Sequence, residues 1–403
     1  MIPVTEALSH ILSNLKPVGH EEIPVADGLG RVLASDVAAN LTYPPTDISA
    51  MDGYAVVASN TATCPVTLRQ IGISQAGSGF EGSVSSGETA RIFTGAPLPS
   101  GADAIVIQEN TDVTGDMVSV REAVTKGTFV RAAGLDFTTG EILRPAGHRL
   151  SARDLGLLAA SNVSILPVYK KPRVAYLATG DELVMPGEPL GPDQIISSNS
   201  IAMDAYIRAF GGETVSLGIA KDNEESLREA LSGLGNADLL ITIGGASVGD
   251  FDLVQSVLGG EGLELGFYKV AMRPGKPLIF GNLNGTPMLG LPGNPVSAGV
   301  TALLFVRPAI SRLSGCNGES VLHRARLGRD LTANDQRQDY LRAALSRNAD
   351  GDLVATPFEK QDSAMMTLLA YADCLIIRPP FAESSDVDSE VDIMLFGYGC
   401  DAY

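Results

Sequence analysis

The stretch RVAYLATGDE (residues 173–182) decides the fold, because an apolar run of strand length ends in a turn with acidic side chains. Two similar apolar runs follow, TVSLGIA (214–220) and DLLITIGG (238–245). Segments with a helical pattern lie between or after these runs, at 200–210, 224–232, 252–258 and 295–313. Strands that alternate with helices predict βαβ units and an open, mostly parallel sheet. Such sheets bind their ligands just beyond the carboxyl ends of the strands.

Four loop motifs lie at or near these strand ends. They are Thr179-Gly-Asp-Glu182, Gly244-Gly-Ala-Ser-Val-Gly-Asp-Phe-Asp252, Arg273-Pro-Gly-Lys-Pro277 and Leu291-Pro-Gly-Asn-Pro-Val-Ser-Ala298. Three glycines in the second motif allow the backbone to approach an anion and expose amides to it. In the fourth motif, Asn294 is a predicted N-cap and Pro295 suits the first helical position.

The charges of these loops indicate the ligand. Arg273 and Lys276 are basic, whereas acidic oxygens come from Glu182, Asp222, Asp250 and Asp252. Carboxylate oxygens beside phosphate-like anions suit a hard cation such as Mg²⁺ better than Zn²⁺. The residue types therefore predict a phosphorylated ligand with Mg²⁺ in a cleft at the strand ends.

The same motifs resemble those of the MoeA family, which includes the E domain of gephyrin and a plant molybdenum-insertion protein. The similarity extends to SAMDGYAV (49–56) and IFTGAPLPSGADAIVIQE (92–109), in the same order along nearly the whole chain. It implies molybdopterin molybdenumtransferase activity in molybdenum cofactor biosynthesis. In that reaction adenylylated molybdopterin is hydrolysed with Mg²⁺, molybdate enters the dithiolene and AMP is released.

Composition sets the class of protein. The chain has 403 residues, 45% of them hydrophobic and 19% charged, as in soluble globular proteins of several domains. A net charge of −18 argues against a nucleic-acid partner but permits a small anionic ligand in a locally basic cleft. The N-terminus has no basic region of a secretory signal, and no continuous apolar run has the length of a membrane span. Four scattered cysteines and no His/Cys cluster predict free thiols and a cytoplasmic location.

Composition also changes along the chain, and four domains are predicted. Short strand-like runs dominate 43–140, which we interpret as an all-β module inserted into a helical linker domain formed by 1–42 and 141–171. The α/β domain covers 172–318. Residues 319–403 again show strand patterns, with a predicted hairpin turn at Asn348–Gly351, and are predicted to form a small β-barrel.

The resemblance also implies the site residues. Residues with predicted catalytic roles are Asp52, Asp136, Glu182, Asp222, Asp252 and Lys276, of which Glu182 and Asp252 are the predicted Mg²⁺ ligands. Predicted ligand-binding residues are Thr94, Gly95, Gly244, Gly245, Ser247, Gly249, Arg273, Pro292, Pro295, Ser297, Arg342 and Ser363. In the family, the equivalents of Asp52 and Asp136 come from the β-module of a partner subunit, so a homodimer is expected.

Purely structural roles are open for several of these residues. Asp222, with Glu225 three residues on, fits a helix cap, and Asp252 also fits an N-cap. Asp52 fits an ordinary Asp-Gly turn. Thr94 and Gly95 also fit turn chemistry, and Arg342 on its own is an unremarkable strand residue.

Five positions depart from the usual family pattern. Arg273 stands where the family usually has lysine, and Ser197 and Leu135 stand where acidic residues are frequent. Asn223 replaces a second acid after Asp222, and Asp362 adds a negative charge beside Ser363. An inward-pointing Asp362 is expected to weaken molybdate binding, and the choice between molybdate and tungstate is open.

Two other functions compete with molybdenum insertion. One is a non-catalytic molybdopterin-binding or scaffold protein, and the other is molybdopterin adenylyltransferase, which resembles the α/β domain alone. The additional helical and β modules favour insertion. Expected partners include the adenylyltransferase and molybdoenzyme chaperones, with neither nucleic acid nor membrane among them.

Overall fold

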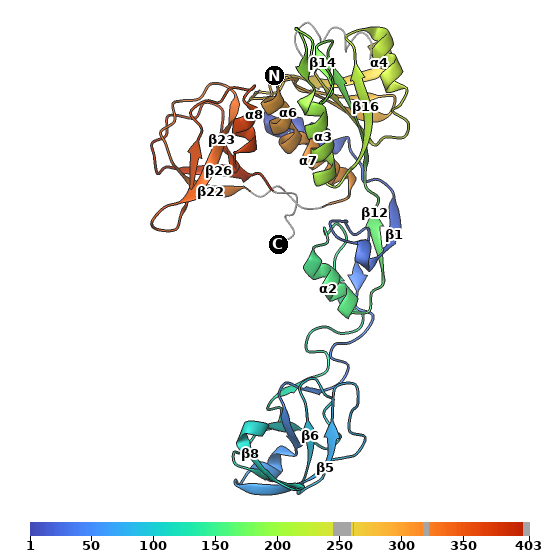
Figure 1. The fold of residues 1–403 in the computed structure, drawn as a ribbon, viewed down its shortest axis with the longest axis vertical. Helices are drawn as coiled ribbons and strands as arrows, with labels where there is room; N and C mark the ends of the chain where they lie inside the picture. Colours follow the sequence, from blue (N-terminus) through green and yellow to red (C-terminus); the bar gives the residue numbers. More distant parts are fainter. Residues whose placement is uncertain (245–258, 261, 317–321, 398–403) are drawn as a thin grey trace. The chain divides into compact units, whose positions relative to one another are not determined.

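A computed structural model describes residues 1–244, 259–260, 262–316 and 322–397. The chain divides into two compact units (Figure 1). Unit 1 comprises residues 1–35, 146–152 and 166–403, and unit 2 comprises residues 36–145 and 153–165.

Unit 1 contains a six-stranded sheet in the order β16-β13-β17-β21-β20-β18. Its strands are β13 (Arg173–Thr179), β16 (Glu213–Ala220), β17 (Leu239–Ile243), β18 (Leu263–Tyr268), β20 (Ile279–Leu283) and β21 (Thr286–Leu291). The first four strands of the order are parallel, and β20 and β18 are antiparallel. The predicted mostly parallel sheet is therefore confirmed, with an antiparallel pair at one edge that the sequence patterns did not indicate.

Both faces of this sheet are buried, which explains the unbroken apolar run of β13. Val174 and Tyr176 pack into a large core cluster that includes residues of the helical stretches 4–13, 198–209 and 295–313. Ala175 and Leu177 face the other way, toward clusters that include side chains of a fourth helix. A parallel strand covered on both sides needs continuous hydrophobicity rather than alternation.

Helices cover the sheet (Figure 1). They are α1 (Val4–Ser13), α3 (Ser198–Ala209), α4 (Glu224–Leu231), α6 (Pro295–Thr301) and α7 (Arg307–Leu313), with a π-helical segment η4 (Ala302–Val306) that joins the last two. The continuous stretch Pro295–Leu313 is long and apolar enough to cross a membrane, but 78% of it is buried inside the structure. That burial is typical of the core helix of a globular domain.

The remainder of unit 1 includes a closed barrel. Its strands are β22 (His323–Leu327), β23 (Gln338–Arg347), β24 (Leu353–Pro357), β25 (Cys374–Arg378) and β26 (Glu390–Leu395). They close in the order β23-β24-β22-β26-β25 and back to β23, which confirms the predicted C-terminal barrel. A short helix, α8 (Met366–Ala370), lies between β24 and β25. The predicted Asn348–Gly351 turn joins β23 to β24, with the Asn348 side chain accepting two backbone N–H groups.

A two-residue strand joins the α/β sheet region to the barrel. It is β19 (Met272–Arg273), which pairs in parallel with the start of β23. Two other small sheets complete unit 1, β1 (His20–Pro24) with β12 (Ile165–Tyr169), and β14 (Leu183–Val184) with β15 (Ile195–Ile196).

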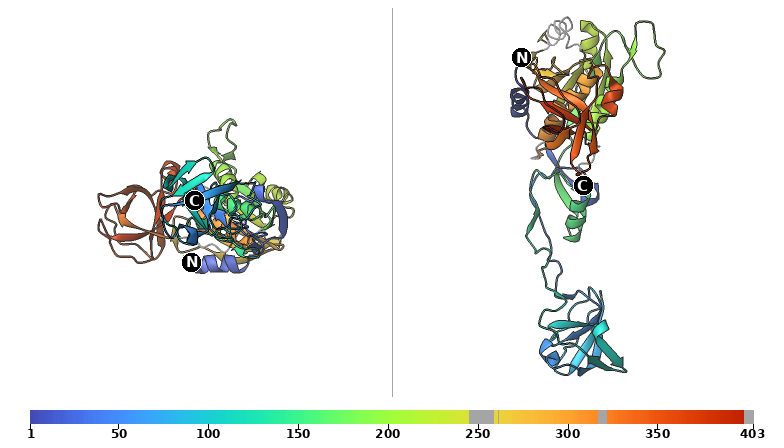
Figure 2. Two further views of the ribbon diagram at one scale, coloured as in Figure 1. Left: turned by 90° about the horizontal axis from the view of Figure 1, so that it is seen from below. Right: turned by 90° about the vertical axis from the view of Figure 1, so that its left-hand side faces the viewer.

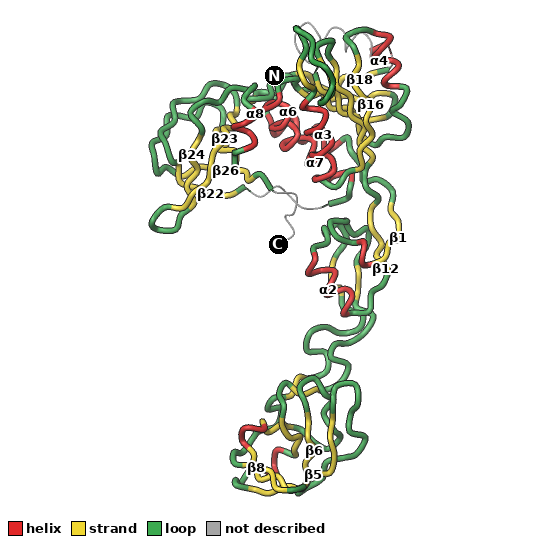
Figure 3. Tube along the Cα trace, in the orientation of Figure 1, coloured by secondary structure: helices red, strands yellow, loops and turns green. Residues whose placement is uncertain are grey.

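Unit 2 is mainly β structure (Figures 2 and 3). Its main sheet has the order β7-β4-β6-β5-β9-β8. These strands are β4 (Gly53–Val56), β5 (Val66–Ser74), β6 (Glu88–Ile92), β7 (Ala104–Ile107), β8 (Thr111–Thr114) and β9 (Met117–Val120). Two short ribbons pair β3 (Ile48–Ser49) with β10 (Val130–Arg131) and β2 (Val37–Ala38) with β11 (Ile142–Arg144).

The segments expected to form a helical linker contain more strand than that description implies. Helix α2 (Ala152–Ala160) is present, but residues 20–24, 37–38 and 142–144 are strands. Residues of α1 pack in the same core cluster as residues of the α/β sheet, so this helix contributes to the central core. The predicted domain limits remain predictions, since the observed division of the chain follows other boundaries.

Candidate active site

Glu182 lies just beyond the carboxyl end of β13, on the exposed surface of the Thr179–Glu182 turn. Its carboxylate folds back over Gly180, where a Cβ atom would lie 2.5 Å from Glu182 Oε2. Gly180 has φ +149°, a conformation that L side chains rarely adopt. This turn therefore requires glycine, and it presents the predicted metal ligand to solvent at the strand end.

Asp222 lies beyond the end of the neighbouring strand β16, and its backbone N–H donates to Asp181 Oδ1 at 3.2 Å. The structural alternative for Asp222, that it caps the following helix, is wrong, and its predicted catalytic role remains a prediction. Helix α4 begins at Glu224, and Asn223 is its N-cap, with Oδ1 accepting from Ser226 N at 2.9 Å. The departure at Asn223 therefore has a structural purpose, and the turns bearing Glu182 and Asp222 are joined.

Gly244 ends the central strand β17 in a backbone conformation with φ +93°. Its N–H donates to Leu291 O at 3.1 Å, and a Cβ atom here would lie 2.6 Å from Thr179 O. The Thr179 hydroxyl is buried and, within the described part of the chain, has no hydrogen-bond partner. A close-packed strand end with an unsatisfied hydroxyl therefore stands where the predicted anion loop begins.

The rest of that loop lies outside the described residues, including Gly245, Ser247, Gly249, Asp250 and Asp252. The residues that are described contain no group of three His, Cys, Asp or Glu side chains placed to hold a metal. The Glu182–Asp252 pair thus remains a prediction.

The Leu291–Ala298 motif connects β21 to α6 and contacts two other parts of unit 1. The Asn199 amide, in α3, donates to Gly293 O at 2.7 Å. The Asn294 amide donates to Ser363 Oγ at 3.0 Å, and Val296 N donates to Ser363 O at 3.1 Å. Asn294 occupies the predicted N-cap position, but its side chain makes no capping bond. Its amide instead binds the barrel.

An apolar cavity of about 340 Å³ adjoins this motif. It is lined by residues of α3, α6, α8 and the end of the barrel, namely Asn199, Ala202, Met203, Tyr206, Pro295, Ala298, Gly299, Met366, Leu369, Ala370, Ala372, Phe396 and Gly397. Burial raises the pKa of the Tyr206 phenol. Pro292 and Ser297 are buried in the same motif.

Arg273 is engaged in ion pairs. Its Nε donates to Asp339 Oδ1 at 2.9 Å, its Nη2 donates to Asp339 Oδ2, and its Nη1 lies 3.6 Å from Asp335 Oδ2. Asp339 is 5% exposed. The side-chain hydrogen bond from Arg337 holds the pKa of Asp335 well below its usual range. Lys276, three residues after Arg273, has an exposed side chain.

Arg342 lies in the barrel and is 1% exposed. Its Nε donates to Gln361 Oε1 at 3.2 Å, and its Nη1 donates to Met365 O at 3.3 Å. Burial lowers the pKa of this guanidinium, although Asp362 opposes the shift. Arg342 therefore holds the loop that carries Ser363, which is a different arrangement from a solvent-facing anion ligand.

Asp362 and Ser197, two of the positions that depart from the usual family pattern, each make a short local hydrogen bond. Asp362 is exposed, and its Oδ1 accepts from Ala364 N at 2.8 Å, as in a turn. Ser197 is buried at the start of α3, and its hydroxyl lies 2.7 Å from that of Ser200. An aspartate at position 197 would place a charge in this buried contact.

The remaining predicted site residues belong to unit 2, where Asp52 and Thr94 contact each other. Asp52 Oδ1 accepts from Thr94 N at 2.7 Å and from Thr94 Oγ1 at 2.8 Å. The backbone hydrogen bond of Thr94, then that of its hydroxyl, lowers the pKa of Asp52, with a smaller contribution from Arg91. Gly95 follows with φ +80°, and its N–H donates to Ser49 O. The Asp-Gly segment and the Thr-Gly segment thus form one constellation.

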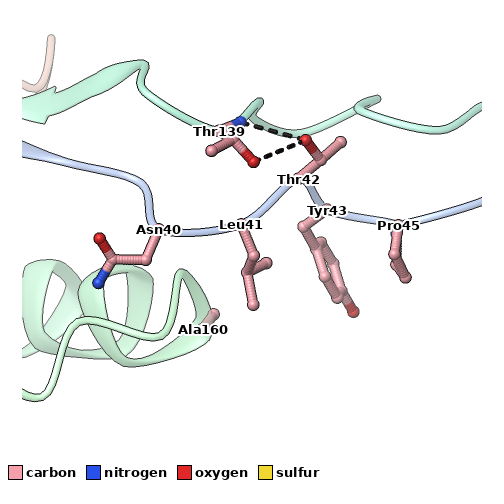
Figure 4. A pocket seen from close by; sticks show the side chains of 7 residues that line it. All are labelled: Asn40, Leu41, Thr42, Tyr43, Pro45, Thr139 and Ala160. Atoms are coloured by element: carbon pink, nitrogen blue, oxygen red, sulfur yellow. Dashed lines mark hydrogen bonds between the residues drawn. The ribbon is translucent and has the colours of Figure 1, made fainter.

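Asp136 and Leu135 are both exposed, and Leu135 is 64% exposed. The backbone N–H of Asp136 donates to Tyr43 O at 3.1 Å. An open hollow in the same unit, lined by Asn40, Leu41, Thr42, Tyr43, Pro45, Thr139 and Ala160, contains none of the predicted site residues (Figure 4).

Sequence reasoning missed Asn199 and Asp339 as parts of this region, and it included Thr179 in a loop motif without predicting a role for its hydroxyl. The partners of Asn199 and Asp339 are distant in sequence, 94 residues in one case and 66 in the other. No local pattern reports such pairs. The position of Thr179 at a strand end was a usable signal, but its unsatisfied hydroxyl appears only in the structure.

Three regions of known protein families match this chain, one after another along its length. Residues 2–161 match the MoeA N-terminal region (domains I and II), 175–312 match a probable molybdopterin-binding domain, and 324–396 match the MoeA C-terminal region (domain IV).

Curated relatives and solved structures agree. A molybdopterin molybdenumtransferase of Nostoc sp. is 38% identical over 85% of this chain and 82% of its own. One of Bacillus subtilis is 33% identical over 98% of this chain and 94% of its own. The crystal structure of the molybdopterin biosynthesis MoeA protein from Pyrococcus horikosii superposes with a TM-score of 0.83 at 33% identity, over 98% of this chain and 99% of that one. The chain belongs to the MoeA family.

Proposed function

We propose that this protein is a molybdopterin molybdenumtransferase, an enzyme of molybdenum cofactor biosynthesis that inserts molybdenum into molybdopterin. The observation that carries the proposal is the match along almost the whole chain to proteins of that name, at 33% identity over 98% of the chain in one case. The three family regions cover both described units, whereas an adenylyltransferase resembles the α/β domain alone.

The finer proposal concerns the substrate. Adenylylated molybdopterin carries a phosphoanhydride, which we place beyond the carboxyl end of the parallel strand β17, next to the glycine-rich sequence that begins at Gly244. The Thr179 hydroxyl, buried beside Gly244 and unsatisfied among the described residues, adds a donor for a phosphate oxygen there. Lys276 contributes an exposed ammonium group, which suits a phosphate or molybdate oxyanion.

Glu182 and Asp252 are the residues proposed to hold Mg²⁺. The donors fit this ion: Mg²⁺ commonly binds through one or two carboxylates, waters and substrate phosphates, without a full cage of protein ligands. An exposed Glu182 at a strand end suits such an arrangement. When bound, Mg²⁺ would neutralise charge on the phosphoanhydride.

Ser363 and the Leu291–Ala298 motif are proposed to shape the molybdate subsite. The Asn294–Ser363 hydrogen bond holds a barrel residue against the start of α6. Free N–H groups at the start of a helix favour an oxyanion. The N–H of Val296 already donates to Ser363 O. We therefore assign the oxyanion to the backbone N–H groups of the exposed residues Gly293 and Asn294. These residues orient the oxyanion, and AMP leaves as the phosphoanhydride is hydrolysed.

Asp52 and Asp136 are proposed to act from the β-module of a second copy, so that the working unit is a homodimer. Asp52 is well suited to a site that needs a fixed charge, because two Thr94 donors hold one of its oxygens and lower its pKa.

The experiment that tests the function uses the purified protein with adenylylated molybdopterin and Mg²⁺, and follows AMP release with and without molybdate. We expect molybdate to stimulate release, with no need for ATP. Tight pterin binding without release would contradict the proposed insertion and favour a carrier or scaffold. ATP-dependent adenylylation would favour an adenylyltransferase.

A further inference from the structure

Arg273 and Asp339 form a two-point contact between the α/β region and the barrel. Arg273 ends β19, and Asp339 lies beside it in the register of β23. Both carboxylate oxygens of Asp339 accept from the guanidinium of Arg273. A planar fork on a carboxylate fixes orientation as well as distance. The two residues are therefore held as a rigid pair.

The surroundings of Asp339 explain why this pair persists. The carboxylate is 5% exposed, so an ionised Asp339 requires compensation by cations. Arg378, which is 4% exposed, and Arg337 also interact electrostatically with Asp339. The Arg378 guanidinium donates to the backbone carbonyls of Thr332 and Glu383, and Arg337 pairs with Asp335. Arg273 is the cation that bonds to both Asp339 oxygens.

The loop after Arg273 is anchored on its other side too. Gly275 has φ +105°, and a Cβ atom there would lie 2.6 Å from Thr301 Cγ2 of α6. The carbonyl of Lys276 accepts from both Val270 N and Leu278 N. With prolines at 274 and 277, the loop has little freedom to move independently. Displacement of Arg273 should therefore be transmitted to Lys276.

We propose that Asp339 is a positioning residue, which acts through Arg273 to fix the 273–277 loop and so to place the Lys276 ammonium group for an oxyanion. The inference rests on the proposed function, since it concerns the anion of the same site. In this proposal Arg273 anchors the 273–277 loop, and Lys276 binds the anion.

The sign of the effect of Asp339→Asn separates this role from simple electrostatics. Asparagine removes a negative charge opposite Arg273, at the start of the 273–277 loop, and releases the Arg273 guanidinium. If Arg273 bound the anion directly, or if charge alone mattered, oxyanion affinity would rise. A positioning role requires the opposite, a fall of about tenfold, because a tenfold change corresponds to the loss of one well-placed interaction.

The measurement is the equilibrium binding of molybdate alone to the full-length protein, by calorimetric titration, for the wild type, Asp339→Asn, Arg273→Lys and Lys276→Ala. We expect Asp339→Asn to weaken binding about tenfold and Arg273→Lys to weaken it less, since lysine keeps the charge but loses the fork. Combined with Lys276→Ala, Asp339→Asn should add little, because both act through one ammonium group.

A second readout guards against loss of fold. Amide exchange in a peptide spanning 269–280 should accelerate in Asp339→Asn, whereas the barrel strands β22 and β26 should keep their protection. Arg324→Gln is the matched control, because it removes an exposed barrel ion pair with Glu390 and should change neither readout. Asp335→Asn, which removes the weaker 3.6 Å contact, should have a smaller effect than Asp339→Asn.

Unchanged or tighter molybdate binding in a folded Asp339→Asn protein would overturn the proposal. Additive effects of Asp339→Asn and Lys276→Ala would also overturn it. If the wild type binds molybdate but releases no AMP from adenylylated molybdopterin, the proposed function fails while the positioning test stands, so the two failures are distinguishable.

Discussion

The amide of Asn294 donates a hydrogen bond to the hydroxyl of Ser363 at 3.0 Å, although the two residues lie 69 positions apart in the chain. Asn294 precedes helix α6 and Ser363 belongs to the barrel part of the chain. The contact, supported by Val296 N to Ser363 O, joins two segments with predicted ligand-binding residues.

Ser363→Ala should weaken molybdate-dependent AMP release while it leaves the fold almost intact. The backbone bond from Val296 does not need the serine side chain, so we expect a loss of about 1 kcal/mol or less in the free energy of unfolding. Asn294→Ala should give a similar loss of activity, and the loss in the double variant should be smaller than the sum of the two single losses. Urea unfolding and AMP release measure the two effects. Strictly additive losses in activity would show that the pair does not act as a unit.

Arg342→Ala should destabilise the barrel strongly. The substitution empties a buried site and leaves Gln361 Oε1 and Met365 O without their guanidinium donor, for a cost of about 2–5 kcal/mol. Arg324→Ala on the same barrel is the matched control, because its side chain is 67% exposed and should change stability by less than about 1 kcal/mol. Thermal unfolding compares them. A stable Arg342→Ala protein with weakened anion binding would instead favour a direct ligand role.

Gly244→Ala and Gly187→Ala form a pair matched in backbone conformation, since both glycines have φ +93°. Gly187 has open space around a new Cβ atom, so alanine there carries only the backbone strain, about 1–2 kcal/mol. At Gly244 the Cβ atom would lie 2.6 Å from Thr179 O, which adds about 1–3 kcal/mol of overpacking. Urea unfolding of both variants measures the difference. Equal destabilisation would mean that the strand end relaxes without cost.

Periodicity and composition were enough to predict much of this fold. Because β13 is covered on both faces, its apolar run was continuous and predicted a strand within 173–182, and the structure places that strand at Arg173–Thr179. The antiparallel edge strands β20 and β18 were not indicated, because direction depends on pairing partners rather than on local pattern.

The site was predictable where a motif is local and not where it depends on distant partners. Asp52 and Thr94 were each identified by short motifs, and the structure brings them together. Arg273 was predicted as an anion ligand from the motif around it. Its ion pair with Asp339 could not be predicted, because Asp339 is 66 residues away in the sequence. Asp222 was predicted as a site residue, with helix capping as the structural alternative, and the start of α4 at Glu224 gives the capping role to Asn223 instead.

Asp52 should titrate below its ordinary value of 3.8, because the folded protein stabilises its ionised form. Because this pKa is lower in the folded than in the unfolded protein, ionised Asp52 stabilises the fold. That stabilisation is fully present above the pKa of the unfolded state and is lost as the pH falls through the pKa of the folded state. Thr94→Val removes the hydroxyl donor but keeps the backbone donor, so the pKa should rise only part of the way back. Carboxyl NMR titration measures this, with the exposed Thr67→Val as control. If Asp52 had the same pKa in Thr94→Val as in the wild type, the Thr94 hydroxyl would contribute nothing to the lowered pKa.

Mixed dimers test whether the β-module acts across subunits. Co-expression of Asp52→Ala and Glu182→Ala chains, with different affinity tags, yields heterodimers in which a shared site would contain either both substitutions or neither. If each site combines the β-module of one copy with the strand ends of the other, one of the two sites is intact, so the purified heterodimer should recover about half of wild-type AMP release. The matched control combines Asp52→Ala with Asp136→Ala. Both substitutions lie in the β-module, so each site of that heterodimer carries one of them, and no recovery is expected. An inactive Asp52→Ala/Glu182→Ala heterodimer, with each parent homodimer also inactive, would place both residues in one site of a single chain.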